Sequence, residues 1–134
     1  MMLSLENHPF FTPWEDRVYE VELADRQRKL IWPRTMYHAR CDGQKRFYCG
    51  DQYPYEWNDR KPCSVWLMDR NTGKDAAIAS SLPQPPVPMG RWREYHMDPH
   101  PHFSANGNFV IYTTTALGAI NVALCPVDQA ADRM

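Results

Sequence analysis

The sequence lacks an excess of charge of either sign. It carries 15 basic and 16 acidic residues among 134, for a formal net charge of −1, and like charges do not cluster in runs. Proteins that bind nucleic acid depend on a basic surface. We therefore expect no nucleic-acid partner, and the function has to reside in a local site.

Long apolar runs and targeting segments are missing as well. No stretch approaches the roughly 20 apolar residues of a membrane-spanning helix, and the opening MMLSLENHPFF lacks the basic start and apolar run of a signal peptide. CxxC spacing is absent, so reduced, mostly buried thiols are expected, with a disulfide pair as the alternative. These absences predict a soluble, cytoplasmic protein without a membrane partner. The four cysteines are Cys41, Cys49, Cys63 and Cys125.

Glycine is scarce and no segment has the 3.6-residue period of an amphipathic helix, whereas proline is abundant. Six glycines, 12 prolines and an aromatic content of 13% are typical of a β-rich protein with ordered turns. Alternating polarity over residues 17–32 predicts a β-hairpin. We expect an antiparallel, all-β chain. Its further strands are expected near 36–41, 45–50, Val65–Leu67 and 75–80, on both sides of the Ala105-Asn106-Gly107 turn, and over 119–127.

Two segments of the chain resemble each other. Residues 38–48 and 102–112 each begin with a histidine, pass through an Asp/Asn-Gly turn and continue into an aromatic-rich strand. Asp42-Gly43 is a strong turn signal, because glycine accepts the positive φ that a tight turn needs. The offset of 64 residues exceeds the roughly 40–50 residues of one propeller blade. Loops at 51–62 and 81–90 account for the excess.

This repeat predicts one domain, 1–134, built from about two four-stranded, blade-like sheets. The first unit covers 15–80, a proline-rich connector covers 81–94, and the second unit covers 95–128. The N-terminal hairpin is expected to close the second unit, in the same chain or in a neighbour's. Two blades alone leave long strand edges, which folded proteins close or cover. The chain is therefore either a propeller remnant or, as we favour, a homo-oligomer that forms a closed ring.

Three of the five histidines, His96, His100 and His102, lie within seven residues. In an extended segment, residues two apart face the same way, and the prolines beside His100 stiffen the chain. His100 and His102 thus make half of a site for a divalent transition metal. His38, at the matching place in the other unit, is the expected third ligand. The alternative is a histidine-proline loop that holds no metal.

Two segments of the chain also resemble a known family, namely HPHFSANGNFVIYTTT and YHARCDGQKRFYCGD. The first resembles the closing blade of the oligogalacturonate lyases, and the second resembles the blade before it. Ulvan lyases, which are propellers with a metal near this region, are similar too. The resemblance covers roughly 17–128 and is most specific at 36–51 and 95–115. It implies part of a seven-bladed β-propeller that cleaves oligogalacturonate by β-elimination with a manganese-type ion.

The resemblance also implies metal ligands. The family uses three histidines and a glutamine, and the ion expected here is Mn²⁺, with Zn²⁺ as the alternative. Met97 stands at the glutamine position, so His96, Asp98 or a water would complete the set. Asp98 can equally accept a hydrogen bond from an imidazole or cap a turn. The histidines that match the family's ligands are His38, His100 and His102.

β-Elimination requires a base for the C5 proton of a uronate and a partner for its carboxylate. A neutral imidazole can act as that base near physiological pH, and an arginine can hold the carboxylate. The residues we expect in these roles are His96 and Arg93, with His8, Arg91 and Arg40 as alternatives, and Trp92 offers a ring for sugar stacking. The base and arginine that the family uses lie in earlier blades, which have no counterpart in this chain.

The sequence thus predicts a metal-dependent, lyase-like protein that acts on or binds acidic oligosaccharides. A non-catalytic carbohydrate-binding or scaffold module with a structural metal is the first alternative. A small metalloenzyme of another kind, with a three-histidine site in a β-barrel, is the second.

Overall fold

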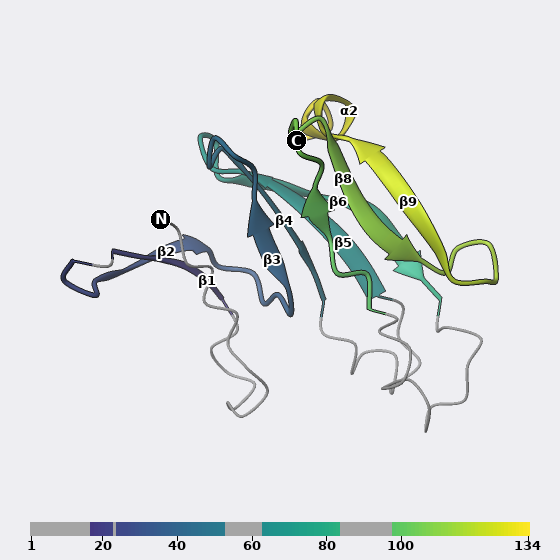
Figure 1. Ribbon diagram of the computed structural model, residues 1–134, viewed down its shortest axis with the longest axis horizontal. Coiled ribbons are helices and arrows are strands. Elements are labelled where there is room, and N and C mark those ends of the chain that lie inside the picture. The colour runs from purple at the N-terminus through teal and green to yellow at the C-terminus, as the bar shows by residue number, and fades with distance from the viewer. Residues whose placement is uncertain (1–16, 23, 53–62, 84–97) are drawn as a thin grey trace, which may run out of the picture.

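The computed structural model describes residues 17–22, 24–52, 63–83 and 98–134 (Figure 1). Strands β1 (Val18–Val21) and β2 (Arg28–Trp32) pair with each other in an antiparallel hairpin, as the alternating polarity of 17–32 predicts. We call this element the hairpin arm. It forms a two-stranded sheet of its own.

A four-stranded antiparallel sheet follows, with the strand order β3-β4-β5-β6. Each strand pairs with its neighbour in sequence, which is the meander expected of one blade-like unit. Its strands are β3 (Ala39–Cys41), β4 (Phe47–Asp51), β5 (Cys63–Asp69) and β6 (Lys74–Leu82).

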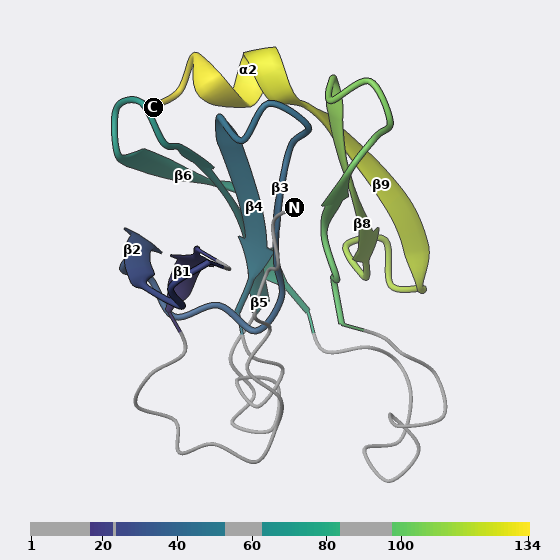
Figure 2. The same cartoon turned by 60° about the vertical axis from the view of Figure 1, so that its left-hand side comes forward.

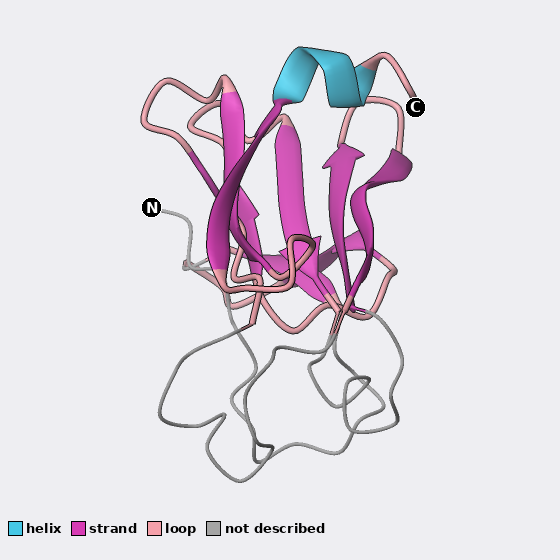
Figure 3. Cartoon of the chain, turned by 90° about the vertical axis from the view of Figure 1, so that its right-hand side faces the viewer, coloured by secondary structure: helices cyan, strands magenta, loops and turns pink. Residues whose placement is uncertain are grey.

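The last unit is a three-stranded antiparallel sheet with the order β7-β8-β9, and a short helix, α2, lies at one end of the strands (Figure 3). The short helix was not expected from the sequence, because five residues are too few to display a 3.6-residue period. The elements are β7 (His102–Phe103), β8 (Phe109–Thr114), β9 (Asn121–Pro126) and α2 (Val127–Ala131). The all-β, antiparallel fold class is confirmed, in the form of a partial, propeller-like arrangement of sheets.

The two faces of β5 bury different side chains against different neighbours. Val65 and Leu67 face the three-stranded sheet, where they belong to apolar clusters that include Val110 and Tyr112. Met68, on the opposite face, belongs to a cluster with residues of the hairpin arm. Strand residues alternate in direction, so the period-2 pattern of this strand places apolar side chains on both faces. Each fully buried aliphatic side chain contributes about 1.5–3 kcal/mol.

The three sheets therefore form a stack, with the four-stranded sheet in the middle. Figures 1 and 2 show the hairpin arm on one side of it and the three-stranded sheet on the other. Among the described residues, the arm bonds to no strand of the three-stranded sheet. In this structure, the arm thus forms a separate sheet and does not close the second unit of the same chain. The domain boundaries stay a prediction.

Polar contacts fix the arm against the middle sheet. The indole nitrogen of Trp32 donates to Asp75 at 2.8 Å, and Arg34 donates to both oxygens of the same carboxylate at 2.9 and 3.0 Å. Arg70 donates to Glu20 of β1 at 2.7 Å. Hydrogen bonds from Arg34 and Trp32 hold the pKa of Asp75 below its ordinary value, against the opposing effect of burial.

The turn at Asp42-Gly43 differs from its prediction. The residue with positive φ is Lys45 (φ 57°) and not Gly43. The carboxylate of Asp42 accepts from the backbone N–H groups of Arg46 and Phe47 at 2.7 and 3.0 Å, which makes the turn longer and moves its left-handed position. Gly107, in the matching turn, does have a positive φ of 73°.

All four cysteines are free thiols in this structure, as expected for reduced cysteines. Cys49 and Cys63 are buried, while Cys41 and Cys125 are half-buried. Burial raises the thiol pKa of Cys49 far above its ordinary value, and Asp51 adds to that effect. A thiol that resists ionisation is a poor metal ligand. Separately, no helix among the described residues is long and apolar enough to cross a membrane.

Candidate metal centre

The site begins with the pairing of β3 and β4. Ala39 lies opposite Gly50, so His38 and Asp51 are the next pair outward. The backbone N–H of Asp51 donates to the carbonyl of His38 at 3.1 Å, and the N–H of Tyr37 donates to the carbonyl of Asp51 at 2.8 Å. These bonds extend the ladder by two residues and fix the backbone that carries His38.

Gly50 permits this close approach. A Cβ atom at position 50 would lie 2.8 Å from the carbonyl oxygen of His38 and 2.9 Å from the sulfur of Met36. Both distances are shorter than van der Waals contact, and one of the two atoms belongs to the backbone. Glycine is thus required here by space and not by a special φ.

The carboxylate of Asp51 connects the two halves of the site. Its side chain is fully buried. One oxygen accepts from the backbone N–H of His38 at 2.8 Å, and the other accepts from the backbone N–H of His100 at 2.8 Å. Nδ1 of His38 lies 3.1 Å from the second oxygen. A carboxylate that binds Nδ1–H orients an imidazole and leaves Nε2 for a ligand, as in many metal sites.

The segment that carries His100 is held by its neighbours in sequence. Pro99 and Pro101 are fully buried, and the carbonyl of Pro99 accepts from the N–H of Thr113 in β8 at 2.8 Å. His100 itself has a positive φ of 43°, a conformation that is uncommon outside glycine and is found where the surroundings enforce it. The prolines and Asp51 together supply that enforcement.

Three side chains meet at this point. The ligand atoms of His38, Asp98 and His100 lie within 4.8 Å of one another. The rings of the two histidines have centroids 4.0 Å apart, and Nε2 of His38 lies 3.8 Å from a carboxylate oxygen of Asp98. His38 and Asp98 have side chains only 12% and 13% exposed, whereas His100 is exposed. The group is therefore buried on one side and open on the other.

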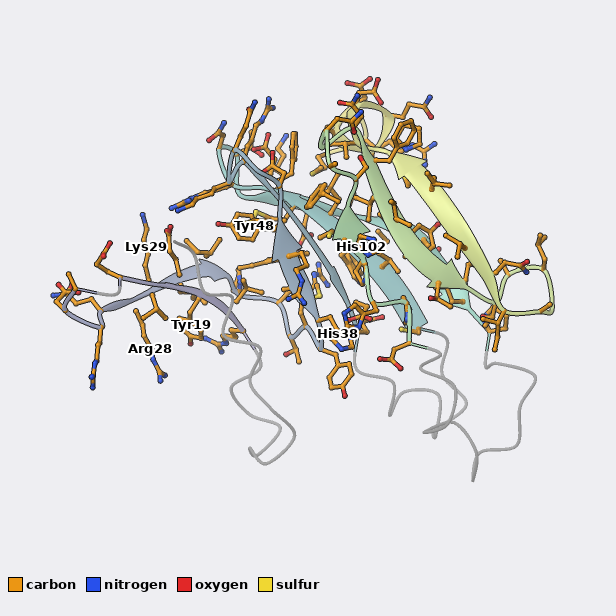
Figure 4. The ribbon with its side chains drawn as sticks, viewed as in Figure 1. Tyr19, Arg28, Lys29, His38, Tyr48 and His102 are labelled. Atoms are coloured by element: carbon orange, nitrogen blue, oxygen red, sulfur yellow. The ribbon has the colours of Figure 1, made fainter. Side chains whose placement is uncertain are left out.

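His102 does not join this group. It lies at the start of β7, is exposed, and is separated from His38 in Figure 4. The expectation that His100 and His102 project from one face assumed an extended segment, and the positive φ of His100 breaks that geometry. The structure thus brings together two of the three expected histidines, His38 and His100, and adds Asp98.

Asp51 is the residue that sequence reasoning missed. Asp51 is the last residue of the segment YHARCDGQKRFYCGD and of strand β4. The sequence feature that could have identified Asp51 is an aspartate at the end of a strand that is expected to be buried, because a buried charge needs partners. Asp98 was one of the groups expected to replace the family's glutamine ligand, whose position is occupied by Met97. The expected catalytic residues, His96 and Arg93, lie outside the described residues.

Two imidazole nitrogens and one carboxylate oxygen form a mixed donor set suited to a divalent transition metal. Asp51 holds the backbone of His38 and of His100 and contacts the ring of His38. His100 is the exposed member of this set.

No known family model and no curated protein matches this chain. Solved structures do match in fold. An oligogalacturonate lyase in complex with manganese superposes with a TM-score of 0.62 at 17% identity, over 82% of this chain and 28% of that one. An oligogalacturonate lyase from Vibrio parahaemolyticus superposes with a TM-score of 0.65 at 14% identity, over 83% and 29%. The chain thus spans less than a third of these proteins, and its fold is similar to that part of an oligogalacturonate lyase.

Proposed function

We propose that this chain binds a divalent metal ion through His38, Asp98 and His100 and uses it to bind or cleave acidic oligosaccharides. The convergence of these three ligand atoms within 4.8 Å carries the proposal. The buried carboxylate of Asp51 supports it, because orientation of a ligand histidine through Nδ1 is a recurrent feature of metal sites.

Mn²⁺ is the ion we favour, with Zn²⁺ as the alternative. Carboxylate ligands suit Mn²⁺ and imidazole suits Zn²⁺, so the donor set accommodates both. The match to a lyase in complex with manganese adds support for Mn²⁺. His102 is left outside the ligand set in this proposal, although its sequence spacing suggested otherwise.

In a lyase reaction, a base removes the C5 proton of a uronate, the C5–H electron pair forms the C4=C5 double bond, and the C4–O bond breaks. The departing oxygen then takes a proton. A bound divalent ion would neutralise the uronate carboxylate and so acidify the C5 proton. We assign the base to His96 and the second carboxylate contact to Arg93, on their chemistry. His38, Asp98 and His100 would hold this ion, with His100 as the exposed member of the set.

The second candidate function is a non-catalytic carbohydrate-binding module. The chain spans only 28–29% of the lyases it matches. Such a module would bind the oligosaccharide through the metal centre without cleaving it.

Metal binding is the first test. The purified chain is stripped with a chelator and titrated with Mn²⁺ and with Zn²⁺, and bound metal is measured by elemental analysis. His38→Ala and His100→Ala should each weaken binding at least tenfold, and Asp98→Asn should weaken it as well. His102→Ala is the matched control and should bind as the parent does. Parent-like binding by His38→Ala would disprove the site.

Activity is the second test. The metal-loaded chain is incubated with oligogalacturonate, and the unsaturated uronate product is followed by its ultraviolet absorbance. Product formation that disappears in the His96→Ala variant, with metal content unchanged, supports the lyase. Metal binding with saturable binding of oligogalacturonate and no product supports the module. Absence of both oligosaccharide binding and product would refute the proposed ligand class.

A further inference from the structure

In the part of the chain that the structure describes, β9 lies at an edge of the three-stranded sheet. The four-stranded sheet is bounded by β3 and β6, whereas β9 ends a sheet of three. Among the described residues, no strand pairs with the edge of β9 that faces away from β8. An edge of this kind exposes backbone donors and acceptors to any strand that can add to it.

The same edge is strongly apolar. Val122 and Leu124 of β9 are 69% and 60% exposed. In addition, β9 contains no charged residue that would discourage pairing with another strand. The cross-strand partners of Val122 and Leu124 are Thr113 and Ile111, so one face of the sheet continues this surface across β8. Exposed apolar side chains gathered on an edge strand are typical of an interaction surface.

At the opposite end of the stack, the hairpin arm projects away from the molecule (Figure 1). Its tip, from Ala24 to Leu30, is exposed throughout. Leu30 is 42% exposed and lies opposite Tyr19, so the two share one face of the arm. A lone two-stranded hairpin is marginally stable in water, and further strands stabilise it.

The arm cannot reach the open edge of its own chain. The four-stranded sheet lies between them, and the bonds of Trp32 and Arg34 to Asp75 hold the base of the arm on the far side. The arm therefore does not pair with β9 within one copy, whereas the arm of a second copy can approach this edge. Charges agree with this pairing, since the arm exposes Arg28 and Lys29, while Asp128 of α2 and Asp132 just after it are exposed beyond β9.

We propose that copies of this chain associate head to tail, with the hairpin arm of one copy adding to the β9 edge of the next. Leu30 and Tyr19 then extend the apolar surface of Val122 and Leu124. The interface is heterologous, because two different surfaces meet, so it generates a ring or an open chain of copies. The proposal stands apart from the metal centre and from the proposed function.

The first test is the mass of the purified full chain by light scattering over a range of concentrations. Association that increases with concentration is expected, and a monomer at every concentration would overturn the proposal. Val122→Lys combined with Leu124→Lys should weaken association at least tenfold, while far-UV circular dichroism stays unchanged because both side chains are exposed. Ser80→Lys, on the exposed part of edge strand β6, is the matched control and should associate as the parent does.

The second test separates this geometry from a symmetric one. Leu30→Lys, on the arm, should also yield a monomer. When the arm variant is mixed with the β9 variant, each retains the surface that the other needs, so a one-to-one dimer should form and grow no further. If the mixture stays monomeric while the parent associates, the interface does not join the arm to β9 and the proposal fails.

Discussion

A single carboxylate, Asp51, determines the geometry of the candidate site. It is fully buried, and it accepts from the backbone of His38 and of His100 while it contacts the ring of His38. Because these groups come from two different sheets, one side chain couples the sheets and orients a ligand at the same time.

Asp51→Asn should therefore have two measurable effects. An amide keeps one acceptor oxygen and loses the other, so we expect a loss of about 2 kcal/mol in the free energy of unfolding. Metal affinity should fall by roughly 10–100-fold, because the ligand imidazole loses its orienting partner. Urea denaturation and metal titration measure these effects. Asp69→Asn, which alters another buried carboxylate, should reduce stability and leave metal affinity unchanged.

Gly50→Ala tests the packing behind His38. The added methyl group would meet the carbonyl of His38 and the sulfur of Met36, so stability should fall by about 1–3 kcal/mol and metal affinity should decrease. Gly43→Ala is the control, because no atom lies within 4 Å of a Cβ there. Equal melting temperatures for the two variants would contradict the close approach.

The sequence pointed to His38 because it matches His102 in the internal repeat, and to His100 because it lies two residues before His102. The structure brings His38 and His100 together, and their role as ligands stays a prediction. Sequence reasoning misplaced His102, since nothing in the residue type indicates that His100 adopts a positive φ. It assigned no role to Asp51, because the partners of a buried carboxylate come from segments distant in sequence. The residue types of the candidate site were thus predictable, and which of them come together depended on tertiary contacts.

At the scale of elements, alternating polarity predicted the strands well. The arm over 17–32 and the paired strands around the Asp42-Gly43 and Asn106-Gly107 turns are all present. The helix Val127–Ala131 escaped prediction because of its length. The separation of the arm from the three-stranded sheet also escaped prediction, because it depends on the contacts of Asp75 and not on a local pattern.

The attachment of the arm should depend on pH. Since hydrogen bonds from Arg34 and Trp32 lower the pKa of Asp75 from 3.8, its contribution is complete above that value and is lost as pH falls through the folded-state pKa. Asp75→Asn should thus be less stable than the parent by roughly 1–2 kcal/mol at neutral pH.

That difference in stability should shrink in acid, because the Asp75 carboxyl of the parent then loses its charge and resembles the neutral amide of the variant. Urea denaturation at neutral pH, pH 5 and pH 3 measures it, with Asp132→Asn as the control for an exposed carboxylate. A difference that does not change between neutral pH and pH 3 would show that the charge of Asp75 does not hold the arm.

For the whole molecule, the position of the candidate metal centre between two sheets has a thermodynamic consequence. His38 precedes β3 of the four-stranded sheet, and His100 precedes β7 of the three-stranded sheet. An ion bound by both requires the folded stack, so free metal at 100 times its Kd should stabilise the chain by about 2.7 kcal/mol. Thermal unfolding with and without Mn²⁺ measures this effect. A His100→Ala variant should show no stabilisation, and one that gains as much as the parent would place the ion elsewhere.

The bond from the backbone N–H of His100 to Asp51 crosses from one sheet to the next, unlike the ladder bonds within each sheet. Deuterium uptake at this amide consequently reports separation of the two sheets, whereas uptake within β4 or β8 reports the opening of a single sheet. One exchange rate would then reveal whether the stack comes apart layer by layer or only when the whole chain unfolds.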